Sequence, residues 1–173
     1  MKSNALLIAA AAFAGLSASA MAQGGPTDPQ IAHIAYTAGT IDIEAAKQAL
    51  SHTKTQSVRS FAQEMIRDHQ AVNAKALALV KKLHVTPEDN ATSQGLTKAA
   101  AAEHAKLAKL KGAAFDREYA NNEVAYHKTV NGALSTLLIP SAKNAELKAL
   151  LQTGLTLFTE HQHHAEMVAE NFK

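Results

Sequence analysis

Four long segments with the apolar spacing of an α-helix constrain this chain more than any other feature. Apolar residues recur every three or four positions in the segments 28–51, 56–83, 113–138 and 142–171, which we therefore predict to be helices. The sequence contains no sustained two-residue alternation of the kind that marks a strand, and no internal repeat. These patterns predict an all-α fold, a bundle in which four amphipathic faces bury one common core.

The links between these helices have very unequal lengths. The first and third links span only a few residues, so each joins antiparallel neighbours, and Pro140 is expected to end the third helix. The middle link, residues 84–112, carries loop signals at 86–90 and 93–95 and an extra alanine- and lysine-rich helix at about 97–111. A link of this length can cross the whole bundle, so that the third helix runs parallel to the second. This single long crossover defines a ferritin-like arrangement of a four-helix bundle.

Residues 1–22 have the three parts of a cleavable secretory signal. Lys2 supplies the positive charge, Ala5–Leu16 is an apolar run, and Ala20-Met21-Ala22 presents small residues before a cut at Gln23. The run is too short to span a bilayer comfortably, and no later stretch is long enough, so we expect no transmembrane helix in the mature chain. We therefore predict an exported, periplasmic protein with a linker at 23–27 and one domain at 28–173. Whether it associates with the outer membrane stays open.

The charge balance and the absence of cysteine exclude several classes of partner and cofactor. Lys and Arg number 17 against 15 Asp and Glu, and the basic residues form no clustered face, so we expect no nucleic-acid partner. The chain has no cysteine, which excludes disulfides, thiolate zinc sites and iron–sulfur clusters. Any metal ion in this chain must therefore be held by nitrogen and oxygen donors.

Each of the four long helices places at least one metal-competent side chain at or beside the stripe expected to be apolar. Burying such groups costs several kcal/mol each unless they are paired or coordinated. One divalent ion on the bundle axis would satisfy them, and imidazole with carboxylate suits iron, zinc, copper or manganese. The candidate ligands are Glu44 in the first helix, Asp68 and His69 in the second, Asp116, Glu123 and His127 in the third, and His161 and His164 in the fourth.

Each candidate also has a purely structural interpretation. A single histidine on an apolar face is usually a hydrogen-bonded core residue rather than a ligand. Glu44, three positions after Ile41, fits equally well as a surface partner of Lys47, and Asp68 as a surface charge. Asp116 lies where an acidic side chain favours the first turn of a helix. The coincidence across four helices, rather than any single residue, favours a metal site.

Three blocks of the sequence resemble the bacterial domain-of-unknown-function family 4142. These blocks are FAQEMIRDH at 61–69, FDREY at 115–119 with His127 beyond it, and the segment 158–165 around His161. The resemblance covers nearly the whole mature chain and implies a ferritin-like bundle of the bacterial envelope, with no known activity. Carried over residue by residue, the family pattern points to Glu44, Asp68, His69, Asp116, His127 and His161.

The spacing of the candidate ligands differs from that of di-iron bundles. Those bundles pair Glu-x-x-His motifs, in which His lies three positions after Glu, on two helices. In this chain Glu123 lies four positions before His127. Glu160 and His163 have the three-residue spacing, but we expect them to face outward. We therefore favour a periplasmic bundle that binds one transition-metal ion for sequestration, sensing or stress protection. The alternative is a structural or interaction module of the envelope, with a polar core network and no metal. A ferroxidase- or catalase-like enzyme ranks third, so enzymatic activity stays undecided, as does homo-oligomerisation.

Overall fold

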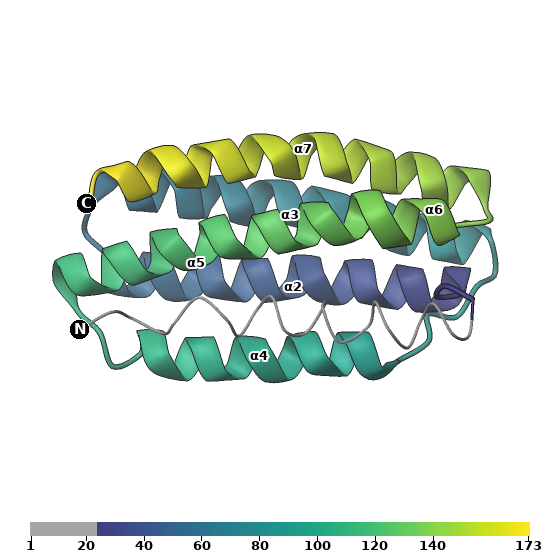
Figure 1. Ribbon diagram of the computed structural model, residues 1–173, viewed down its shortest axis with the longest axis horizontal. Coiled ribbons are helices and arrows are strands. Elements are labelled where there is room, and N and C mark those ends of the chain that lie inside the picture. The colour runs from purple at the N-terminus through teal and green to yellow at the C-terminus, as the bar shows by residue number, and fades with distance from the viewer. Residues whose placement is uncertain (1–23) are drawn as a thin grey trace.

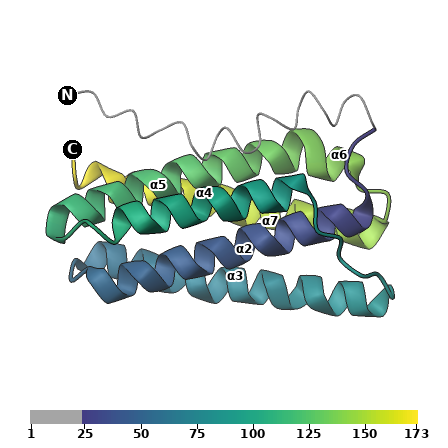
Figure 2. The ribbon, with the colours of Figure 1, turned by 90° about the horizontal axis from the view of Figure 1, so that it is seen from below.

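The computed structural model describes residues 24–173, and the regular structure in this range is entirely helical, which confirms the all-α bundle. The predicted signal peptide, residues 1–22, lies outside the described residues. A fifth helix, α4, covers the outside of the bundle next to α2 (Figures 1 and 2). The five main helices are α2 (Asp28–His52), α3 (Gln56–Lys82), α4 (Ala91–Leu107), α5 (Gly112–Ala133) and α7 (Ala145–Glu170).

The chain crosses the bundle once along its full length. Helices α2 and α3 form an antiparallel hairpin, and α5 and α7 form a second one (Figure 1). Between the hairpins, α4 starts at the end of the bundle where α3 finishes and runs back to the other end. Helix α5 therefore begins at the same end as α3 and runs parallel to it (Figure 1). This is the single crossover that the link lengths predict.

Helix α4 begins earlier than the sequence pattern predicts. Asn90 caps it, because the Asn90 side chain accepts the backbone N–H groups of Thr92 and Ser93, and the Ser93 hydroxyl completes a capping box. The residues 93–95, predicted as loop, are therefore in the first turns of the helix, and the prediction of a start near 97 is wrong. A strong N-cap outweighs the weak helix propensity of serine and glycine here.

The helix that contains α5 continues beyond its predicted end. It widens into a π-helical segment, η2 (Leu134–Leu138), and closes with α6 (Ile139–Ser141). Pro140 has no backbone N–H, and in an α-helix its ring would collide with the carbonyl of Thr136 four residues earlier. The wider π turn lies just before Pro140, at the place where an α-helical turn would produce this collision. Pro140 thus lies in the last turn rather than after the end of the helix.

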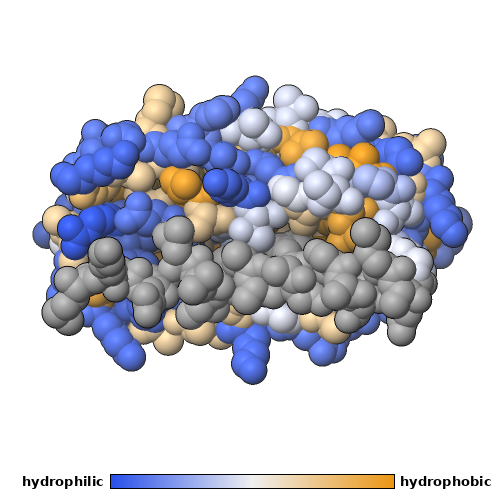
Figure 3. Space-filling model, viewed as in Figure 1, coloured by the Kyte–Doolittle hydropathy of each residue, from blue (hydrophilic) through white to orange (hydrophobic). Residues whose placement is uncertain are grey.

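A layer of buried polar side chains divides the hydrophobic core into two halves. One half surrounds Phe61, Phe115 and Tyr119, and the other surrounds Ile34 and Leu151. Hydrophilic residues predominate on the face seen in Figure 3, so the apolar side chains of the helices largely face inward. We call the set between the two halves the polar layer, and each member is at most 3% exposed: Asp42 from α2, His69 from α3, Glu123 and His127 from α5, and His161 from α7.

Candidate metal centre

Three imidazole rings of the polar layer converge on one another from three helices. His69, His127 and His161 each offer a ring nitrogen, and these three atoms lie within 4.8 Å of one another. The ring centroids are 5.3 Å apart for His69 and His161, 5.5 Å for His127 and His161, and 5.8 Å for His69 and His127. Zinc–nitrogen bonds of about 2.0–2.1 Å at tetrahedral angles place two imidazole centroids roughly 5.2 Å apart. The three rings therefore have nearly the spacing that one shared ion requires.

The fourth helix of the bundle contributes a carboxylate that lies beside two of these imidazoles. Oδ2 of Asp42 lies 3.4 Å from Nε2 of His69 and 3.4 Å from Nε2 of His127. Two donors bound to one zinc ion at tetrahedral angles are separated by about 3.4 Å. Asp42, Glu123 and His127 form a second group of donors within 4.8 Å of one another, which shares His127 with the three imidazoles.

Several nitrogen and oxygen atoms of the polar layer that could bind a metal ion have no hydrogen-bond partner among the described residues. They are both carboxylate oxygens of Asp42, both ring nitrogens of His69, Nε2 of His127, Nδ1 of His161 and Oε2 of Glu123. A buried polar atom without a partner costs about 1–3 kcal/mol, and native proteins contain few of them. So many in one layer fit the binding of a cation, which accepts lone pairs from carboxylate oxygens and from one nitrogen of each neutral imidazole.

Neighbouring groups fix which nitrogen of two imidazoles is free to bind. Nδ1 of His127 lies 3.0 Å from the backbone carbonyl oxygen of Glu123, to which it donates, so its lone pair is at Nε2. Nε2 of His161 lies 3.2 Å from Oδ2 of Asp68, which leaves the lone pair of His161 at Nδ1. Arg67 in turn donates two hydrogen bonds to Asp68, of 2.7 and 2.9 Å. Such carboxylate–histidine pairs commonly orient metal-binding imidazoles.

Burial keeps the imidazoles of the polar layer neutral, the form that binds a metal ion. It lowers the pKa of His69 and of His127 to about 4, and it also lowers the pKa of His161. Burial raises the pKa of Asp42 to about 6, although the nearby His127 opposes this, and it raises the pKa of Glu123 well above its usual value. A bound cation would favour the ionised form of both carboxyl groups.

The remaining predicted ligands lie elsewhere. Glu44 is on the surface, where its carboxylate binds Lys47 at 2.7 Å, so the structure supports the surface interpretation. Asp116 is buried, but it accepts a hydrogen bond from the hydroxyl of Thr55 and is not part of the polar layer. His164 is partly exposed, and its Nδ1 lies 2.6 Å from a carboxylate oxygen of Glu64.

Two other predicted positions lie at the edge of the site or outside it. Asp68, a predicted ligand, contacts His161 rather than the centre, although Glu64, Asp68 and His161 also form a group of donors within 4.8 Å. His163, two residues after His161, is exposed and lies 3.4 Å from a carboxylate oxygen of Glu166, as expected for an outward-facing residue.

Sequence reasoning missed Asp42. Asp42 lies four positions after Ala38 and three before Ala45, both buried, so the helical period alone could have placed it in the core. The predicted core stripe passes through Ile41 instead and therefore places the expected carboxylate at Glu44. Helix α2 packs against α3 on one side and against α4 on another. Its buried face is therefore wide, and the sequence pattern does not show which residue lies at the middle of that face.

A model of the family described as domain of unknown function (DUF4142) matches residues 13–168. The chain belongs to the DUF4142 family. The match includes every residue of the polar layer in this DUF4142 protein. No curated protein and no solved structure matches the chain. Among the described helices of the DUF4142 protein, none combines the length and the apolar character needed to cross a membrane.

Proposed function

We propose that this DUF4142 protein binds one divalent transition-metal ion in its polar layer and serves in the periplasm for metal sequestration, sensing or stress protection. One observation carries the proposal: three helices bring the imidazoles of His69, His127 and His161 within 4.8 Å of one another, and Asp42 of the fourth helix lies 3.4 Å from two of them. The predicted secretory signal at 1–22 supports the periplasmic location.

The donor set restricts the ion. Asp42 supplies a carboxylate, and His69, His127 and His161 supply neutral imidazoles, so nitrogen predominates. Calcium and magnesium prefer shells made only of oxygen, whereas imidazole with one carboxylate suits zinc, iron, copper or manganese. The donor separations of 3.4 Å match tetrahedral zinc and exceed the roughly 3.0 Å between neighbouring ligands of an octahedral ion with bonds of about 2.1 Å.

The competing function is a structural or interaction module of the envelope, in which the polar layer is a hydrogen-bonded network without metal. A network of this kind is stabilising only when its donors and acceptors are paired. In the polar layer, the carboxylate oxygens of Asp42 and the ring nitrogens of His69 lack hydrogen-bond partners within residues 24–173. The geometry therefore favours the metal-binding function over the network.

Metal titration of the protein purified from the periplasm tests the proposal. The metal-free protein is titrated with Co²⁺ and Zn²⁺, and we expect one ion per chain, with the intense visible absorption of tetrahedral cobalt. His161→Ala should abolish this binding. His163→Ala is the matched control, because His163 is an exposed histidine two residues away on the same helix, and it should bind like the wild type.

Three outcomes would contradict the proposal. Absence of saturable binding would leave the structural module as the function. Equal loss of binding in His161→Ala and His163→Ala would place the ion on the surface of α7. Two ions per chain, with loss of one in Glu123→Gln, would replace the single-ion site by a dinuclear centre that uses both donor groups at His127.

A further inference from the structure

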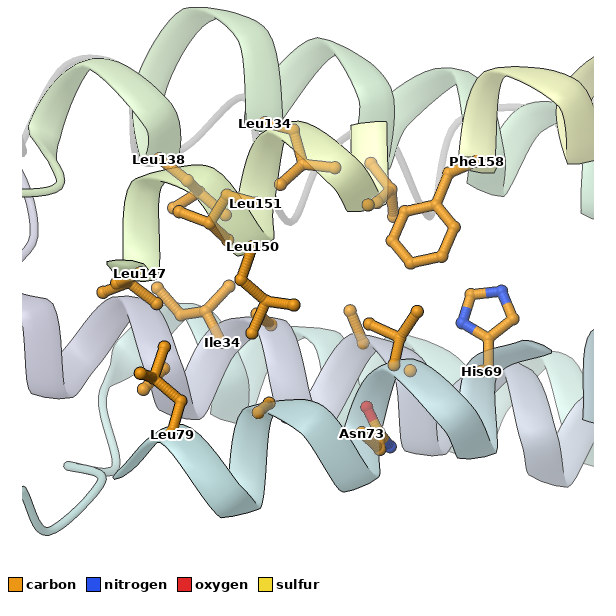
Figure 4. A pocket seen from close by; sticks show the side chains of 18 of the residues that line it. Ile34, His69, Asn73, Leu79, Leu134, Leu138, Leu147, Leu150, Leu151 and Phe158 are labelled. Atoms are coloured by element: carbon orange, nitrogen blue, oxygen red, sulfur yellow. The ribbon is translucent and has the colours of Figure 1, made fainter. Parts of the chain in front are cut away.

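An apolar cavity of about 60 Å³ adjoins the polar layer in the half of the core that contains Leu151. Helices α2, α3, α5 and α7 all contribute to its walls, and the side chains are mainly leucine, valine, isoleucine and alanine. Figure 4 shows Leu79 and Leu147 at one end of the cavity, and His69 with Phe158 at the other. The cavity thus extends along the bundle axis and ends at the imidazoles.

Small residues line this space. Ala38 of α2, Ala76 of α3 and Gly154 of α7 contribute to its walls, and so does Gly39 of α2, where a Cβ atom would collide with the side chain of Asn73. A Cβ atom at Gly154 would lie 3.3 Å from the ring of Phe158, which suggests that this glycine makes room for the ring. The ring of Phe158 in turn stacks on His69, with centroids 4.6 Å apart. One wall of the cavity therefore positions an imidazole of the polar layer.

The volume and the lining define the class of molecule that fits. One water molecule requires about 10–15 Å³ of such volume, so 60 Å³ holds roughly four to six non-hydrogen atoms, whereas an engineered cavity that binds benzene measures about 150 Å³. Cavities with apolar walls stay dry, and a charged molecule inside one would lose its hydration without compensation. The occupant is therefore small, uncharged and apolar.

The lining of the cavity includes both buried and partly exposed residues. His69 and Phe158 are buried, whereas Ala76 and Leu79 of α3 and Leu150 of α7 are partly exposed, which favours entry between α3 and α7. His69 and His127 line the cavity and also belong to the converging imidazoles. A molecule that enters between α3 and α7 can therefore reach the imidazoles without crossing the polar surface.

We propose that this cavity admits small uncharged apolar molecules of the size of dioxygen and leads them to the polar layer. Entry of the molecule depends only on the cavity. Contact with a bound ion rests on the proposed metal-binding function, so the experiment uses the metal-free protein and its outcome is independent of metal binding.

Methyl NMR of the metal-free protein under dioxygen and under xenon tests the proposal. Dissolved dioxygen should increase the relaxation rates of the cavity methyl groups of Val130, Leu134 and Leu151 at least threefold more than those of Val168, which lies in the other half of the core and, like Leu134, is 3% exposed. Xenon should shift the signals of the same three residues. Equal relaxation in both halves would overturn the proposal, and this comparison needs no variant.

A matched pair of variants locates the binding. Ala76→Leu places a larger side chain in the cavity and should abolish the xenon shifts and the extra relaxation. Ala74→Leu makes the same change on the same helix at an exposed position outside the cavity and should retain both effects. Persistence of the xenon shifts in a folded Ala76→Leu protein would overturn the assignment to this cavity.

Discussion

Replacement of His69 by leucine should stabilise the metal-free protein and should remove most of the stabilisation that a bound metal ion provides. His69 is 3% exposed, and neither of its ring nitrogens has a hydrogen-bond partner among the described residues. Nε2 instead lies 3.4 Å from the carboxylate of Asp42. Leucine fills a similar volume with no polar atom, so His69→Leu removes a donor that the metal-free protein leaves unpaired.

The magnitude follows from two opposing terms. Removal of an unpaired buried polar atom gains about 1–3 kcal/mol for each atom, and the ring of His69 has two. Loss of the stacking on Phe158, which has an interplanar angle of 8°, costs roughly 0.5–1.5 kcal/mol. The difference between these two terms is a rise in the free energy of unfolding of the metal-free protein of about 0.5–5.5 kcal/mol. The melting temperature should then rise by roughly 2–4 °C for each kcal/mol.

Excess metal ion should stabilise the His69→Leu protein much less than the wild type. A ligand at 1,000 times its dissociation constant stabilises the folded state by about 4 kcal/mol, and His69→Leu should lose most of this gain. Thermal and urea unfolding with a chelator and with excess Zn²⁺ measure both effects. His163→Leu is the control, since His163 is exposed and should change neither value much. A metal-free His69→Leu protein less stable than the wild type would refute the reasoning, because His69 would then stabilise a network without metal.

Three further predictions concern the surroundings of the polar layer. Asp68→Asn should weaken zinc binding about 10–100-fold in calorimetry, because the charged acceptor that orients His161 is lost; unchanged affinity would contradict this role. Asp116→Asn should leave zinc affinity unchanged and lower the free energy of unfolding by about 1 kcal/mol, because Asp116 bonds Thr55 outside the polar layer. The stability of the metal-free protein, measured by urea unfolding, should fall as the pH is lowered from 6 to 4.5. The three imidazoles take up protons on unfolding, because their folded pKa values are lowered. The two buried carboxyl groups release protons, because their folded pKa values are raised, but they are fewer than the imidazoles, so unfolding takes up protons on balance. A flat profile would show that the two sets cancel.

The architecture was predictable because its signals are local. The helical period marks the four long helices, and the unequal link lengths determine which helices are parallel. The start of α4 is harder to predict, because residues 93–95 are helical only when the side chain of Asn90 caps the helix. That cap requires the extended backbone conformation that Asn90 has in the structure. Periodicity does not detect this contribution of a single side chain.

The candidate site was predictable only in part. His69, His127 and His161 follow from the stripes of α3, α5 and α7, each of which buries one clear face. Asp42 was missed because α2 is buried on more than one side, so that its stripe has no sharp centre. The partner of Asp116 is Thr55, at the start of a different helix, and only the tertiary structure brings them together.

The distribution of donors over the fold limits when a metal ion can bind. The α2–α3 hairpin supplies Asp42 and His69, and the α5–α7 hairpin supplies His127 and His161. Neither hairpin alone offers more than two of these four donors, and the crossover through α4 must bring both together before the shell is complete. An ion at this position would therefore stabilise the packing of one hairpin on the other rather than the formation of either one. The unpaired donors lie where the two halves of the core meet, and we expect the apolar clusters on both sides to hold the bundle together when no ion is bound.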